Sequence, residues 1–273
     1  MILQNGSHGY QVGNKVAETS AYRVYLCEEV KTGVLYLLQV AADVEYNGGL
    51  ERAVYVLKEL KKAADFLEEE YAKIQKVEPK KLLSYDRLFP VLIDSFVAED
   101  QGNRRVNILA FTEVDDIEQL VPLSNLANKD HQRVELRSSA WILGRLLKLL
   151  DFIHAEGIAL RTLAAGNVLL EPKRHFALIF DWSSAQTYEK EVPADIRKDG
   201  IASAAKTVFT AIGGNAETGA CPYSDEEDPR YVEFLWRLAC RRESNAERAH
   251  TQFYELIDEL FGREFRPFKT LPL

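Results

Sequence analysis

Cysteine and histidine are the residue types best suited to thiol, redox or zinc chemistry, and this sequence spaces both of them widely. The cysteines form no CxxC pair and have no histidine at the spacing of a zinc site. No two histidines lie at the ligand spacing of a helical metal site. We therefore expect reduced cysteines in the core and no zinc. The residues concerned are Cys27, Cys221 and Cys240, and His8, His131, His154, His175 and His250.

The charge balance argues against a nucleic-acid binder. The 273 residues include 34 lysines and arginines against 42 aspartates and glutamates, which gives a net charge of −8, whereas binding to phosphate needs clustered positive charge. The acidic run at 225–228 is expected to be a solvated loop. No stretch approaches the roughly 20 apolar residues of a membrane helix, and no signal pattern follows Met1. We expect a cytoplasmic globular protein without a membrane partner.

The first part of the chain has the pattern of a β-sheet with one long helix. Short β-type runs at 24–27 and 34–40 are separated by a turn. A stretch without glycine or proline then predicts a helix over about 50–76, roughly 40 Å long. Strand signals return at 89–96 and 106–114. The apolar residues of the helix are spaced alternately by four and three: Ala53, Leu57, Leu60, Ala64, Leu67, Tyr71 and Ile74.

The second part of the chain is mostly helical. Apolar residues between Ala140 and Ile153 line one face of a helix that Gly157 can end. Two β-type runs follow, at 167–170 and 176–180. The segment 201–212 is apolar nearly all round and predicts a buried helix. Further helices fit 231–240 and 247–261. We expect a β-rich first part, 1–114, and a helical second part, 115–273.

The segment 154–170 resembles the catalytic-loop region of the protein kinase family. His154 and the Gly157-Ile158 pair precede the position of the HRD signature, and Asn167 follows five residues after the position of its aspartate. Residues 180–183 look like the DFG segment. The resemblance implies an α+β, two-lobed protein-kinase-like fold, with a small β-rich lobe bearing one long helix and a mostly helical large lobe.

The same stretch also looks like the aminoglycoside and choline kinase branch, which uses similar GNxL and DW signatures. The resemblance extends to residues 16–26 as the glycine-rich loop and to 31–40 as the VAIK strand. Residues 198–201 resemble the Asp-anchored start of the central helix of the large lobe. On this alignment Ala53 takes the place of the glutamate that pairs with the VAIK lysine, unless a register shift brings Glu51 or Glu59 there.

Departures from the family pattern affect three parts of phosphoryl transfer. Gln39 replaces the VAIK lysine, which removes the charge that holds the nucleotide phosphates. Thr162 replaces the HRD aspartate, and threonine is no general base near neutral pH. The glycines of the phosphate loop fall at Ala17, Thr19 and Tyr22, whose side chains should obstruct a phosphate.

Two features of the family pattern remain in this sequence, namely a pair of metal-ligand positions and an apolar nucleotide site. Asn167 and Asp181 correspond to the residues that coordinate magnesium; alternatively Asn167 ties its loop and Asp181 caps a turn. ATP or ADP would lie between apolar side chains, with backbone hydrogen bonds to adenine from 113–115. Lys15 or Arg23 is an alternative source of the missing charge. The nucleotide-contacting residues would be Val16, Val24, Glu113, Asp115 and Leu169.

The sequence favours a pseudokinase of bacterial type, acting as a binding, scaffolding or regulatory module with or without ATP or ADP and magnesium. The alternatives are a weakly active ATP- and magnesium-dependent transferase and an interaction domain that binds no nucleotide. The seam of the long helix is longer than one small lobe can cover. It therefore predicts a protein partner or a homodimer through helix 50–76, unless residues 82–89 fold back over the seam.

Overall fold

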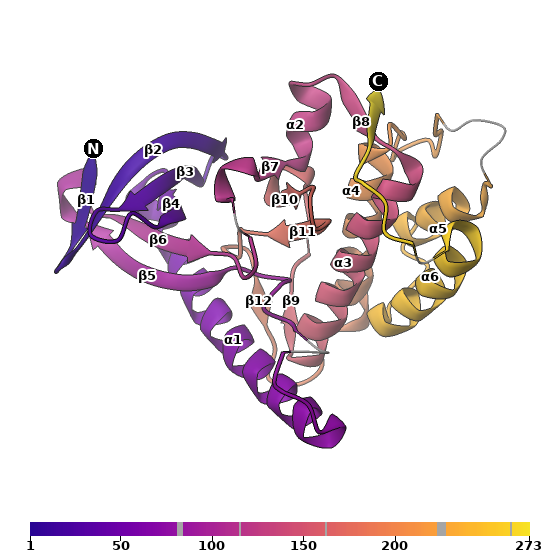
Figure 1. Ribbon diagram of the computed structural model, residues 1–273, viewed down its shortest axis with the longest axis horizontal. Coiled ribbons are helices and arrows are strands. Elements are labelled where there is room, and N and C mark those ends of the chain that lie inside the picture. The colour runs from indigo at the N-terminus through magenta and orange to yellow at the C-terminus, as the bar shows by residue number, and fades with distance from the viewer. Residues whose placement is uncertain (81–83, 115, 162, 223–227, 263) are drawn as a thin grey trace. The chain divides into compact units, whose positions relative to one another are not determined.

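The computed structural model describes residues 1–80, 84–114, 116–161, 163–222, 228–262 and 264–273 (Figure 1). The chain forms two compact units. The first comprises Met1–Leu120 and Phe180–Ala185, and the second comprises Val121–Ile179 and Gln186–Leu273. The first unit therefore extends beyond residue 114, where the sequence placed the division, and includes a segment from much later in the chain. Asp115, Thr162 and the acidic run at 225–228 lie partly or wholly outside the described residues.

The first unit is built on a six-stranded antiparallel sheet with the order β1-β2-β3-β4-β6-β5. Its strands are β1 (Ile2–Asn5), β2 (His8–Glu18), β3 (Tyr22–Glu29), β4 (Leu35–Ala41), β5 (Val91–Ala98) and β6 (Arg104–Ala110). Leu38 and Val40 of β4 face a core that they share with Phe96 and Ile108. Because side chains alternate along a strand, Gln39 faces the opposite side of the sheet.

The long helix α1 (Asn47–Gln75) has 29 residues and packs against β5 and β6. It ends at Lys76, whose φ of 54° is left-handed. The helix expected over 50–76 is therefore confirmed. Its buried residues form one continuous side: Leu50, Ala53, Val56, Leu57, Leu60, Ala64, Glu68 and Ala72.

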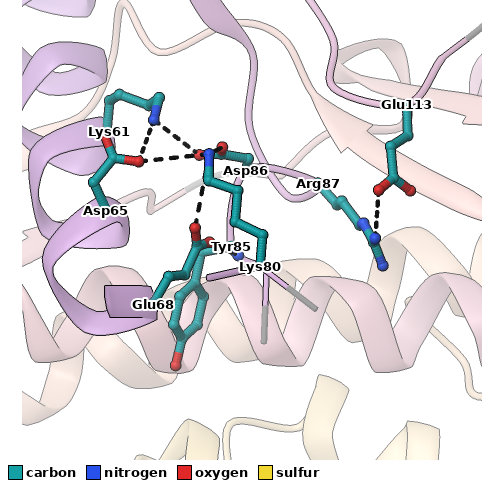
Figure 2. A network of polar contacts seen from close by, with 8 residues as sticks. All are labelled: Lys61, Asp65, Glu68, Lys80, Tyr85, Asp86, Arg87 and Glu113. Carbon is teal, nitrogen blue, oxygen red and sulfur yellow. Dashed lines mark hydrogen bonds and ion pairs between the residues drawn. The ribbon is translucent and has the colours of Figure 1, made fainter. Parts of the chain in front are cut away.

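The segment after α1 folds back along the far half of the helix and is held there by charged groups (Figure 2). The amide of Tyr85 donates to the buried carboxylate of Glu68. The Lys80 ammonium contacts the buried carboxylate of Asp86 and lies 3.9 Å from Glu68 Oε2, and Lys61 Nζ lies 3.6 Å from Asp86 Oδ1. The two ammonium groups thus neutralise most of the negative charge that this fold brings together.

This packing covers only part of the apolar seam predicted along α1. Ala64 is fully buried and Leu67 is half-buried. Tyr71 and Ile74 remain 38% and 72% exposed. The described part of the segment that was expected to fold back, 84–89, does contact the helix, but the end of α1 keeps an apolar surface.

The second unit combines five helices with short antiparallel strand pairs (Figure 1). The helices are α2 (Leu123–Asn128), α3 (Leu136–Ala155), α4 (Ala194–Ala211), α5 (Arg230–Ala239) and α6 (Ala246–Phe261). A three-stranded sheet has the order β11-β10-β7, and β12 pairs with β9 and β13 with β8. The strands are β7 (Val121–Pro122), β8 (Gln132–Val134), β9 (Ile158–Ala159), β10 (Val168–Glu171), β11 (Phe176–Ile179), β12 (Gln186–Thr187) and β13 (Thr270–Pro272).

Helix α3 is the centre of this second core. The side chain of Glu135 caps it by accepting a 2.8 Å hydrogen bond from the Ser138 amide, which satisfies one of the free donors of its first turn. Leu143, Leu146 and Leu147 are fully buried along its inner face. The helix packs against α4 and α6.

Three details differ from the sequence-based expectations. Helix α4 begins at Ala194, directly after Pro193. It therefore starts with about two polar turns before the apolar segment 201–212, which was the part predicted to be helical. Strand β6 ends at Ala110, short of 114. Cys27 is buried, but Cys240 is exposed, so the expectation of three core thiols is wrong. Within the described residues, no helix combines the length and apolar character needed to cross a membrane.

Candidate functional site

Gln39 is placed in the middle of the sheet, on the side that faces α1. Its Cα partners are Val24 of β3 and Asn107 of β6. Asn107 donates from Nδ2 to the carbonyl of Leu50 in α1, at 3.0 Å. Gln39 is 1% exposed. A polar side chain at such a position needs a hydrogen-bond partner, because burying an unpaired amide is unfavourable.

That partner is Asp181, which the segment 180–185 brings into the first unit. Gln39 Nε2 donates to Asp181 Oδ1 at 3.1 Å, and the backbone amide of Ser183 donates to the same oxygen at 2.9 Å. The hydroxyl of Tyr22 is close enough to the Asp181 carboxylate for its charge to act on it. A carboxylate has about four acceptor positions, and Gln39 and Ser183 use two of them, both on Oδ1.

Tyr22 is itself held in place by packing. Its side chain is 4% exposed, and its ring meets Phe180 edge to face, with centroids 6.3 Å apart. Burial and the neighbouring Asp181 charge raise the pKa of the Tyr22 hydroxyl, so the hydroxyl stays protonated. Because Tyr22 occupies the last of the three glycine positions of the aligned phosphate loop, a side chain now lies where the family keeps bare backbone.

The turn between β2 and β3 uses its own amides. Thr19 N donates to the carbonyl of Tyr22 at 2.9 Å. The Thr19 hydroxyl accepts hydrogen bonds from the amides of Ala21 and Tyr22, both at 3.2 Å. A phosphate-binding loop presents such amides to the ligand, whereas this turn binds them internally. Thr19 therefore replaces a glycine with a hydroxyl that closes the turn.

The two cations considered as substitutes for the VAIK lysine, Lys15 and Arg23, bind one and the same carboxylate. Lys15 Nζ and Arg23 Nε both bind the carboxylate of Glu18, the latter at 2.9 Å. All three side chains lie on the surface of the first unit, each more than 40% exposed. The structure therefore assigns both cations to an exposed ion-pair cluster.

The predicted nucleotide-contacting residues are distributed over both units. Val16 is half-buried in β2 and Val24 is fully buried in β3. Glu113 has a φ of 62°, and its carboxylate forms an ion pair with Arg87 (Figure 2). Asp115 lies outside the described residues. Leu169 is fully buried in β10 of the second unit, opposite Leu178.

The catalytic-loop region of the second unit keeps its scaffold. Asn167, the other candidate metal ligand, is half-buried and ends the short 3-10 turn Ala165–Asn167. Leu163 N donates to the Ser203 hydroxyl of α4 at 2.7 Å. Asp199 of α4 binds Arg161 at 3.3 Å and Arg241 at 3.0 Å. Thr162, between these anchored positions, lies outside the described residues.

Helix α4 approaches this loop closely because residue 200 is a glycine. A Cβ atom at Gly200 would lie 2.9 Å from the carbonyl oxygen of Leu160 and 3.6 Å from His154 Nε2. His154 is 8% exposed, and burial, with a smaller contribution from the Arg197 charge, lowers its pKa to about 4. It is therefore neutral at neutral pH, and its role is packing. The Asp199 anchor and the His154 packing follow the implications of the kinase resemblance.

The comparisons with known proteins bear on the fold. No protein-family model and no curated protein matches the sequence. The chain is similar to the crystal structure of the BubR1 kinase domain, with 14% identity, a TM-score of 0.60, and coverage of 95% of this chain and 83% of that one. It is also similar to the structure of vaccinia related kinase 3, with 14% identity, a TM-score of 0.65, and coverage of 95% and 90%.

At 14% identity this likeness shows the fold. The protein has a protein-kinase-like α+β fold, with a small β-rich lobe that carries one long helix and a mostly helical large lobe. The fold class predicted from the sequence is confirmed. What the site does must be argued from its own residues.

Proposed function

We propose that the protein is a pseudokinase, a protein-kinase-like module that binds a partner protein and does not transfer phosphate. The observation that carries this proposal is the state of Asp181. Its carboxylate accepts hydrogen bonds from the side-chain amide of Gln39 and from the backbone amide of Ser183. These bonds give the residue a structural role within the first unit.

The charge balance supports the same proposal. Phosphoryl transfer depends on cations that stabilise the negative charge of the transition state and on groups that position the nucleophile. Gln39 supplies a neutral donor in place of the lysine, and that donor is already bound to Asp181. Thr162 stands in the sequence where the general base belongs. Two independent contributions to catalysis are thus absent from this chain.

The proposal is tested by measuring phosphate transfer directly. Purified protein is incubated with radiolabelled ATP and either magnesium or manganese, with generic protein substrates present. We expect incorporation at background. Autophosphorylation that disappears in Asp181→Ala and persists in Asp195→Ala, a control at an exposed carboxylate, would establish the alternative, a weakly active transferase.

Nucleotide binding is a separate part of the proposal. We infer that ATP and ADP do not occupy a magnesium site on Asp181, because its Oδ1 already accepts from Gln39 and Ser183 and the turn amides of Ala21 and Tyr22 are bound internally. A ligand present at 100 times its dissociation constant would stabilise the folded state by about 2.7 kcal/mol. The unfolding temperature should therefore show no magnesium-dependent shift when it is measured with ATP or ADP at about 1 mM. A shift that Asp181→Ala abolishes would contradict this inference.

We propose that the partner is a second copy of this chain, bound through the outer surface of α1. Phe66 and Ile74 are large apolar side chains about two helical turns apart, and they are 63% and 72% exposed. Exposed apolar surface of this kind favours association.

Light scattering after size-exclusion chromatography should show a dimer that becomes a monomer in the Phe66→Glu, Ile74→Glu double variant. The matched control is Lys58→Glu with Lys62→Glu, which adds charge at exposed polar positions of the same helix. A monomer in the unmodified protein would refute self-association.

A further inference from the structure

A pocket of about 470 Å³ lies between α3 and α6, entirely within the second unit and apart from the site described above. The two helices run antiparallel along it. The Arg137 guanidinium lies 6.0 Å from the ring centroid of Phe261 at one end, and the Lys148 charge acts on His250 at the other. The volume is within the range of small-molecule sites, about 300–1,000 Å³.

The floor of the pocket exists because α3 carries small residues there. A Cβ atom at Gly144 would lie 2.9 Å from Cε1 of Phe253, so the helices make contact where the side chain is absent. Ala140, one turn earlier, also lines the pocket. Larger side chains at these two positions of α3 would fill the space between the helices.

The walls are largely aromatic. Trp141 comes from α3, and Phe253, Tyr254 and Phe261 come from α6. Tyr254 is 59% exposed at the rim, and its ring lies edge to face with His250 at a centroid distance of 4.8 Å. Aromatic rings favour planar ligands that can stack on them or meet them edge-on. The lining therefore suits a flat aromatic body better than a flexible chain.

The charges are distributed unevenly along the pocket. Arg145, Lys148 and His250 line one end, whereas the two carboxylates of the lining, Asp258 and Glu264, lie toward the Arg137 end. Among the described lining residues, three permanent cations stand against two carboxylates. Lys148 also interacts with Asp151, a carboxylate of the same helix that is not part of the lining. Within the lining itself, Arg145 and Lys148 are the groups of α3 that attract an anion at this end.

We propose that this pocket binds an aromatic carboxylate, with its ring between Trp141 and Tyr254 and its carboxylate toward Lys148 and Arg145. The apolar walls would bury the ring, and the cations would orient the ligand by charge-assisted hydrogen bonds. The proposal does not depend on the pseudokinase assignment, since no residue of the pocket belongs to the Asp181 site. It gives the large lobe a ligand-binding role of its own.

The test is a titration of the full chain with three probes, followed by calorimetry, and by fluorescence of Trp141 in a variant with Trp182 and Trp236 replaced by phenylalanine. The probes are 2-naphthoate, the neutral 2-naphthalenemethanol, and the aliphatic anion decanoate. We expect naphthoate to bind at least tenfold more tightly than either of the other two. Equal affinity for the alcohol would refute the role of charge, equal affinity for decanoate would refute the preference for an aromatic ring, and no binding of naphthoate at about 1 mM would refute the site.

Three variants locate the binding. Lys148→Gln should weaken naphthoate binding about tenfold or more, and Lys129→Gln, which removes an exposed lysine of the same unit away from the pocket, should leave it unchanged. Tyr254→Ala truncates an exposed side chain, so the fold should persist while affinity falls. Unchanged binding in both Lys148→Gln and Tyr254→Ala would overturn the assignment of the ligand to this pocket.

Discussion

Removing one amide, in Gln39→Leu, tests whether Asp181 is a structural residue. The substitution puts an apolar side chain of similar size in the sheet and deletes the donor to Asp181 Oδ1. Gln39 and Asp181 are 1% and 8% exposed, so water cannot replace the lost donor. A hydrogen bond to a buried charged group contributes about 1.5–3 kcal/mol. We expect a loss of about 2 kcal/mol in the free energy of unfolding.

A double-mutant cycle isolates this bond from other effects of the substitution. In an Asp181→Asn background the side-chain amide of Gln39 meets a neutral acceptor, and a hydrogen bond between neutral groups contributes about 0.5–1.5 kcal/mol. The coupling between the two substitutions should therefore be about 1 kcal/mol. A residue kept for metal binding behaves differently, because its removal in the absence of metal relieves an unfavourable buried charge and leaves stability unchanged or raised.

The assay can be confined to the first unit. Trp182 is fully buried beside Asp181 and meets Phe89 edge to face. With Trp141 and Trp236 of the second unit replaced by phenylalanine, urea unfolding followed by tryptophan fluorescence reports Trp182 alone. A change below about 0.5 kcal/mol for Gln39→Leu, or a coupling near zero, would refute the reasoning and restore Asp181 as a candidate metal ligand.

Three further predictions concern stability. The pKa of His154 is about 4 in the folded protein against 6.5 when unfolded, so the folded state binds fewer protons and loses about 3 kcal/mol as pH falls from 6.5 to 4; His154→Leu should flatten that part of the curve of unfolding free energy against pH. Gly200→Ala should destabilise by about 1–3 kcal/mol in thermal unfolding, because the added methyl meets the Leu160 carbonyl; an increase in stability would contradict the close approach. Leu60→Ala should lower the free energy of unfolding by about 2–5 kcal/mol and Ile74→Ala by less than about 0.5, measured in urea, since only Leu60 is buried.

The positions that correspond to the kinase motifs could be located in the sequence because the surrounding motifs are continuous. Residues 154–170 align with the kinase loop without a gap, so Thr162 and Asn167 fall at definite positions. The spacing of apolar residues was equally direct for α1. In both cases the signal is local, which is the condition under which a sequence pattern is informative.

The partners of Asp181 could not be predicted in the same way. Gln39 lies 142 residues earlier in the chain, and no local pattern states which side chains a fold brings together. The obstruction expected at Tyr22 was a steric argument, and the structure adds the contact of the Tyr22 ring with Phe180. The exposed Cys240 is a similar case, because it lies just beyond the end of α5 and its surroundings depend on tertiary packing.

The composition of the first unit affects how the protein folds as it is synthesised. The unit is continuous from Met1 to Leu120, and it also includes residues 180–185. After Leu120 has been synthesised, a further 65 residues (185 − 120) must therefore be added before the unit is complete. At typical rates of about 5–20 residues per second, that delay is roughly 3–13 s. During that time the side-chain amide of Gln39 has no Asp181 to bind, so the interior of the first unit lacks one of its buried hydrogen bonds. The small lobe, although it is encoded first, therefore cannot finish folding before much of the large lobe has left the ribosome.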